Sequence, residues 1–104
     1  MLEFSKIEHY DDFEDVVIFW VDVKSPPIRI QEKAKEIDGE NYLDSCFGVC
    51  VNYDVEKNEF YIVTDGDYNL YYVDNNGDKH WFNVEITEDF QSKLFEMCKN
   101  ELSK

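Results

Sequence analysis

"DYNLYYVDNNGDKHWF", Asp67–Phe82, is the stretch that decides the fold. Asn76-Gly77 lies in its middle, and this dipeptide is the strongest short signal for a β-hairpin with a two-residue type I′ turn. Such a turn predicts that Val73 lies opposite His80, Tyr72 opposite Trp81 and Tyr71 opposite Phe82. Alternate residues of a strand share a face, so the apolar residues divide into two sets. One face is expected to carry Tyr71, Val73, His80, Phe82 and Val84, and the other Leu70, Tyr72 and Trp81.

A second hairpin is predicted just upstream, in "FGVCVNYDVEKNEFYIVTD", residues 47–65. Apolar residues alternate on both sides of a polar segment, as in strands with one buried face. A four-residue loop at Val55–Asn58 would place Tyr53 opposite Phe60 and Val51 opposite Ile62. A three-residue loop would shift the faces of one strand relative to the other. With the longer loop, one face carries Val49, Val51, Tyr53, Phe60 and Ile62.

The first third of the chain contains one clear strand and one ambiguous segment. "VVIFWVDV", Val16–Val23, is β-branched and aromatic with a single charge, which predicts the most central strand, buried on both faces. In residues 1–15 an apolar side chain recurs at every third position: Phe4, Ile7, Tyr10 and Phe13. This spacing favours a helical turn or two, with an irregular arm or a short edge strand as the alternative.

Helices are predicted over residues 26–38 and 88–102. In "SPPIRIQEKAKEIDGE", Ser25 can cap the N-terminus, Pro26 or Pro27 suits the first turn and Gly39 suits the left-handed end. In "TEDFQSKLFEMCKNELSK", Thr87 is the expected N-cap. Apolar stripes at helical spacing would face the sheet: Ile30, Ala34 and Ile37 in the first helix, and Phe90, Leu94, Met97 and Cys98 in the second.

These elements predict an α+β fold for a single small acidic domain spanning residues 1–104. The order is strand, helix, a meander of strands, helix. The expected sheet is single and mainly antiparallel, with about five strands and the helices packed on it. We find no internal repeat or low-complexity segment.

The chain is strongly acidic, with 24 acids against 10 bases and a net charge of −14. A hydrophobic share of 43% is too high for a disordered acidic tail, so the chain is expected to be globular. The charge can serve solubility alone, or it can attract a basic partner. Direct binding to nucleic acid or to an anionic membrane is disfavoured, because phosphate contacts need clustered bases. The cluster Arg29, Lys33 and Lys35 has Glu32 and Glu36 interleaved with it.

The sequence predicts no catalytic, metal or cofactor site. Cys46, Cys50 and Cys98 lack the spacing of a zinc site, and a pair of Cys50 with His80 is better explained as packing. Asp and Asn in turns explain Asp65, Asp67, Asp74 and Asp78 without a calcium ion. An odd cysteine count, no long apolar run and no basic leader favour a cytoplasmic protein with reduced thiols.

One candidate binding surface remains. If both helices cover the same face of the sheet, Leu70, Tyr72 and Trp81 stay exposed on the other, and Tyr and Trp dominate binding hot spots. The alternatives are helices on opposite faces, or an N-terminal arm over the aromatics. The expected charged rim is Asp65, Asp67, Asp74 and Asp78. A further acidic contact is expected at Asp11, Asp12, Glu14 and Asp15.

We therefore expect a non-catalytic acidic binding module, an inhibitor that occludes the basic surface of a partner protein. A toxin, a nuclease or another nucleic-acid-binding protein is the expected partner class, as for bacterial immunity proteins, antitoxins and phage inhibitors. The alternative is a homo-oligomeric structural protein that uses the aromatic face for self-association. The protein would be a monomer in the first case and a homodimer in the second.

Overall fold

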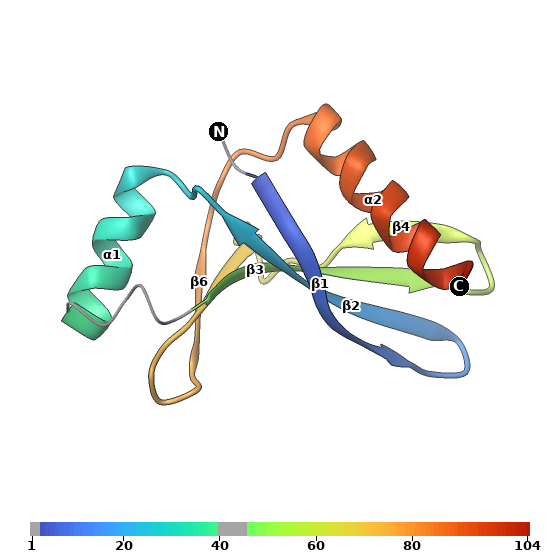
Figure 1. Ribbon diagram of the computed structural model, residues 1–104, viewed down its shortest axis with the longest axis horizontal. Helices are drawn as coiled ribbons and strands as arrows, with labels where there is room; N and C mark the ends of the chain where they lie inside the picture. Colours follow the sequence, from blue (N-terminus) through green and yellow to red (C-terminus); the bar gives the residue numbers. More distant parts are fainter. Residues whose placement is uncertain (1–2, 40–45) are drawn as a thin grey trace.

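The computed structural model describes residues 3–39 and 46–104 and contains one antiparallel six-stranded sheet with two helices. Figure 1 shows both helices, α1 and α2, on the same side of the sheet. The predicted α+β class and the single antiparallel sheet are confirmed. The sheet has one strand more than the number expected, because the N-terminal segment is itself a strand.

That strand is β1 (Glu3–Asp12), which forms a hairpin with β2 (Val16–Lys24) at the edge of the sheet. The predicted helical turn is wrong, and the edge-strand alternative is correct, although the strand is ten residues long. Register shifts between Phe4 and Lys6 and between Ile7 and His9 explain the misleading spacing. Each shift adds one residue, so every third residue, and not every second, reaches the core side. Phe4, Ile7 and Tyr10 accordingly pair with Val23, Val21 and Phe19.

β2 is buried on one face, not on both as predicted. Its buried side chains alternate with half-buried ones along the strand. The central strand is β3 (Cys46–Asp54), which pairs with β2 along one edge and with β4 (Glu59–Ile62) and β5 (Leu70–Val73) along the other. The alternation in β2 means that its second face is available for contacts outside the core.

The β3–β4 hairpin has the predicted register. Tyr53 pairs with Phe60 and Val51 with Ile62, across a four-residue loop. Asn58 in this loop has a φ of 56°, in the left-handed region that Asn tolerates. The carboxylate of Asp54 accepts a hydrogen bond from the backbone N–H of Lys57 at 3.0 Å and so holds the loop.

The hairpin of β5 with β6 (Lys79–Phe82) differs from the prediction by one residue. Tyr71 pairs with Trp81, Tyr72 with His80 and Val73 with Lys79. The loop contains a type I turn, with the Gly77 N–H donating to the Asp74 carbonyl at 3.0 Å. Gly77 follows it at a φ of 86°. This combination gives a three-residue loop with a bulge, whereas a type I′ turn would give a two-residue loop.

The side chain of Asp74 explains this choice of turn. One of its carboxylate oxygens accepts the backbone N–H groups of Asn76 and Asp78, each at 2.9 Å. Hydrogen bonding of this kind by Asp is a local signal that competes with the preference of Asn-Gly for a type I′ turn. The slip by one residue exchanges the faces of one strand relative to the other, so Trp81 lies beside Tyr71.

Both helices pack on one face of the sheet and share one core. α1 (Ile28–Asp38) buries Ile30 and Ala34, and α2 (Glu88–Leu102) buries Phe90, Leu94 and Cys98. The core cluster contains residues from both helices and from the buried positions of β2 and β3. The alternative with helices on opposite faces is therefore wrong.

Most of the predicted helix ends are confirmed. The Thr87 hydroxyl accepts a hydrogen bond from the Phe90 N–H at 3.1 Å, as expected of an N-cap. Gly39 ends α1 at a φ of 62°. The predicted cap by Ser25 is wrong, because α1 begins after Pro27, which supplies no side-chain hydrogen bond.

Candidate functional site

The face of the sheet opposite the helices carries a band of mainly apolar and aromatic side chains across five strands. We call it the open face. In each strand these residues alternate with residues on the helix side, and across the strands they pair with one another. Its members are Ile18, Trp20, Cys50, Asn52, Tyr61, Tyr71, Val73, Lys79 and Trp81. Figure 1 shows this side of the sheet with no helix over it.

An aromatic cluster of Trp20, Tyr71 and Trp81 lies at the middle of the open face. The Tyr71 ring stands edge-on to Trp20, with centroids 5.9 Å apart, and to Trp81, with centroids 5.7 Å apart. Edge-to-face contacts of this kind are favourable beyond the area they bury. Tyr71 itself is only 4% exposed, whereas both tryptophans are half-buried. The tryptophans therefore present the accessible part of the cluster.

Gly48 in β3 makes this cluster possible. β3 lies between β2 and β5, so a side chain at position 48 would separate Trp20 from Tyr71. A Cβ at Gly48 would overlap the Tyr71 ring. The absence of a side chain lets Tyr71 lie across the backbone of β3 and reach Trp20 on the next strand.

The side chain of Lys79 makes cation–π contacts with this cluster. The Lys79 ammonium nitrogen lies 4.9 Å from the ring centroid of Trp20 and 5.8 Å from that of Tyr71. Both distances are within the range of cation–π attraction. The rings thus face a site that accepts positive charge.

Three carboxyl groups, those of Glu8, Asp11 and Asp22, border the same site, and together with Trp20, Tyr71, Val73 and Lys79 they line a hollow of about 260 Å³. The Trp20 indole N–H donates to the Asp11 carboxylate at 3.3 Å. Burial raises the pKa of Asp22, and the neighbouring Glu8 raises it further by hydrogen bonding and by charge. Lys6, which pairs with Glu8 at 3.6 Å, acts in the opposite direction on the Asp22 pKa.

Asp74 stabilises the β5–β6 loop through its side-chain hydrogen bonds. A hydrogen bond with the His80 ring, at 2.7 Å, is the main reason that the pKa of Asp74 lies below its usual value. Nearby, the Tyr72 hydroxyl donates to the Asp38 carboxylate, which also accepts the Asn75 N–H at 3.3 Å. These contacts tie the end of α1 to the hairpin on the helix side of the sheet.

The structure changes the predicted aromatic surface. Leu70 and Tyr72 are fully buried on the helix side, so neither can lie on a surface of the folded protein. The cause is the one-residue difference in the hairpin register. Trp81 does lie on the open face, and its neighbours there are Tyr71 and Trp20.

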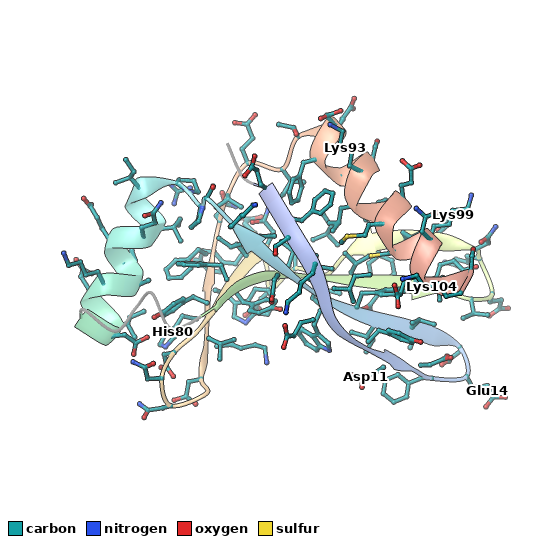
Figure 2. The ribbon with its side chains drawn as sticks, viewed as in Figure 1. Asp11, Glu14, His80, Lys93, Lys99 and Lys104 are labelled. Carbon is teal, nitrogen blue, oxygen red and sulfur yellow. The ribbon has the colours of Figure 1, made fainter. Side chains whose placement is uncertain are left out.

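The predicted acids do not gather around a single patch. Asp11, Asp12, Glu14 and Asp15 lie at the free end of the β1–β2 hairpin, next to the end of β3 at Asp54. Asp74 and Asp78 lie beyond Val73, which pairs with the opposite end of β3 at Cys46. Asp65 and Asp67 are exposed in the connection between β4 and β5. Figure 2 shows Glu14 far from His80, which marks the other hairpin, whereas Asp11 lines the hollow together with Lys79.

Sequence reasoning placed Lys79 at the rim of the Trp81 surface but missed Trp20, Tyr71 and the carboxyls of Glu8 and Asp22. A signal for two of them was present in β2. Asp22 lies two residues after Trp20, so both side chains point to the same face of the sheet. A carboxylate on that face needs water or a polar partner, which indicates that the face is not part of the apolar core. The contact of Trp20 with Tyr71 joins residues far apart in the sequence, and no local pattern indicates it.

The thiols of Cys50 and Cys98 are free and buried in the fold. Burial raises the pKa of Cys50 to about 11 and that of Cys98 to about 12. Cys50 lies on the open face, whereas His80 pairs with Tyr72 on the helix side, so the two do not form a nucleophile pair. The Cys46 side chain lies outside the described part of the structure. Among the described residues, no group of three or more His, Cys, Asp or Glu side chains is arranged to hold a metal ion.

Comparison with protein-family models, with curated proteins and with solved structures finds no match. Within residues 3–39 and 46–104, neither helix has the length and apolar character needed to span a membrane.

Proposed function

We propose that the protein is a non-catalytic binding module that captures a basic partner protein through its open face. The observation that carries this proposal is a sheet face without a helix over it, with the aromatic cluster at its centre and carboxyl groups beside it. Apolar patches with a polar rim are typical of interaction sites. Trp and Tyr supply most of the binding energy at such sites, because they bury a large area and lose few torsions.

The distribution of charge supports a basic partner. α1 contains three acids and three bases, and α2 four acids and two bases, so the helices hold little of the net charge of −14. Figure 2 shows Lys93 and Lys99 along α2 and Lys104 just beyond its end, on the helix side of the molecule. Most of the excess negative charge therefore belongs to the strands and their loops. A field of one sign accelerates encounter with a partner of the opposite sign.

The same charge argues against self-association as the main role. Two copies that met through their open faces would bring Glu8, Asp11 and Asp22 of one toward the same carboxyls of the other. Like charges placed together at an interface cost several kcal/mol. A partner that binds nucleic acid, such as a nuclease or a toxin acting on nucleic acid, carries the complementary basic surface, and occupying that surface would inhibit it.

Affinity capture followed by binding kinetics tests the proposal. The wild-type protein, a Trp81→Ala variant and a Tyr61→Ala variant are immobilised and exposed to lysate of the source cells, and the captured protein is purified. We expect a basic protein whose association rate falls about tenfold or more between roughly 0.05 and 0.5 M NaCl. Trp81→Ala should weaken binding by about 2 kcal/mol, and Tyr61→Ala, at a more exposed position, should also weaken it.

Tyr68→Ala is the matched control, because Tyr68 is 50% exposed but lies in the β4–β5 connection outside the open face. It should leave binding unchanged. A salt-insensitive association rate together with a neutral Trp81→Ala substitution would sink the proposal. Sedimentation that shows a stable dimer abolished by Trp81→Ala would favour the homo-oligomeric alternative.

A further inference from the structure

The hollow beside the aromatic cluster has the chemistry of a site for one planar cation. Its walls are the rings of Trp20 and Tyr71 and the carboxyl groups of Glu8, Asp11 and Asp22. A guanidinium group suits both kinds of wall, because it stacks on aromatic faces and donates paired hydrogen bonds to carboxylates.

The position of Lys79 is an independent sign that the rings attract a cation. Its ammonium group lies over Trp20 at 4.9 Å, although Lys79 is exposed and could extend into water. An ammonium group is a compact, strongly hydrated charge, whereas guanidinium is planar and more weakly hydrated. An incoming arginine therefore has an advantage over Lys79 on the same ring surface.

Among the described residues that line the hollow, carboxyl groups outnumber cations. Among the described side chains, Lys6 pairs with Glu8 at 3.6 Å, and Lys79 lines the hollow together with Glu8, Asp11 and Asp22. Burial is the main cause of the raised pKa of Asp22, and the hydrogen bond and charge of Glu8 add to it, because these two carboxyls lie close together. A cation held between Glu8 and Asp22, closer to them than Lys79 is in this structure, would favour the ionised form of Asp22.

We propose that this hollow receives an arginine side chain of the basic partner, which stacks on Trp20 and Tyr71, displaces Lys79 and pairs with Glu8 and Asp22. The inference rests on the proposed function and specifies how the open face selects its partner. Arginine would provide the anchor, and the surrounding apolar residues would exclude water from it.

A titration with blocked tripeptides tests the inference without the natural partner. The peptides carry arginine, citrulline or lysine at the centre, citrulline being the neutral analogue of arginine. Trp20 and Trp81 are the only tryptophans of the chain, and both lie on the open face, so their indole N–H signals in NMR report on this site. The arginine peptide should shift the Trp20 signal, and the citrulline peptide should bind about tenfold more weakly.

Two pairs of variants separate this site from general attraction to an acidic protein. Glu8→Gln with Asp22→Asn should weaken binding of the arginine peptide about tenfold, whereas Asp65→Asn with Asp67→Asn, an equal change of charge elsewhere, should have a much smaller effect. Lys79→Met should strengthen binding severalfold by removing the competing ammonium. Lys57→Met, the matched loss of one lysine from the β3–β4 loop, should not.

Each opposite result has a distinct meaning. Equal losses from the two pairs of acid substitutions would overturn the arginine site and leave a diffuse attraction that still agrees with a basic partner. A lysine peptide that binds as well as arginine would overturn the preference for guanidinium. Equal binding of the arginine and citrulline peptides would overturn both this inference and the proposed basic partner.

Discussion

Gly48 has no side chain, and the arrangement of the open face depends on that absence. The ring of Tyr71 occupies the space that a Cβ at position 48 would fill, and it reaches Trp20 across β3. Gly in the interior of a strand otherwise weakens the strand. Its presence in the central strand therefore has a definite reason, the close approach of an aromatic ring.

Gly48→Ala should destabilise the protein by about 1–3 kcal/mol, because the added methyl group displaces Tyr71 from its place between the tryptophans. Urea unfolding followed by tryptophan fluorescence measures the change. In a Tyr71→Ala background the same substitution should cost clearly less, since the ring that it meets is gone. An equal cost in both backgrounds would show that Gly48 is needed for another reason.

The β5–β6 hairpin determines which aromatic residues belong to the core. Its loop uses left-handed geometry only at Gly77, whereas the type I′ turn suggested by Asn76-Gly77 would need it at both positions. Asp74 stabilises the observed loop through the N–H groups of Asn76 and Asp78. The resulting register sends Tyr72 to the core and Trp81 to the open face.

Alanine substitutions distinguish the two turns. Gly77→Ala should destabilise the protein by about 1 kcal/mol or more, because alanine is strained at a positive φ. Asn76→Ala should cost much less, since φ at Asn76 is not positive. Thermal unfolding of the two variants compares the costs. Similar large losses at both positions would indicate a type I′ turn and the shifted register.

The whole molecule carries a net charge of −14 on 104 residues, so its folded state contains substantial repulsion. The lysine ion pairs that the structure gives, such as Lys93 with Asp89 and Lys104 with Glu101, join exposed or half-exposed side chains. Pairs of this kind contribute little stability. A basic partner would reduce the repulsion on binding.

We expect sodium chloride to stabilise the free protein. Raising its concentration from about 0.01 to 0.15 M shortens the Debye length from roughly 30 to 8 Å and screens the repulsion. The gain should be on the order of 1 kcal/mol, or roughly 4–8 °C in Tm, measured by circular dichroism. Neutralising Asp65 and Asp67 together as Asn should reduce this dependence. A Tm that falls with salt would mean that attractive pairs outweigh the repulsion.

Several features were predictable because local chemistry specifies them. The alternation of apolar residues and the length of the Val55–Asn58 loop gave the correct register of β3 with β4. Thr87 and Gly39 marked helix ends through hydrogen bonding and backbone conformation within one turn of the chain. The α+β class followed from the order of these elements.

The site was less predictable, for reasons that lie outside local sequence. The bulges of β1 convert a period of two into a period of three, which resembles a helix until the partner strand is known. The side chain of Asp74 outweighed the Asn-Gly preference and moved every pair of the last hairpin by one residue. Trp81 was recognised as a surface residue, but its neighbours were not.

The sequence by itself determined the class of fold, the helices, one hairpin register and the acidic character, because each depends on composition or on residues close together in the chain. Only the tertiary structure decided that both helices cover the same face and that Trp20, Tyr71 and Trp81 meet on the other. These residues come from β2, β5 and β6, and they meet because β3 lies between β2 and β5 with a glycine at the crossing point. Contacts across strands depend on the topology of the whole sheet, which no single segment encodes.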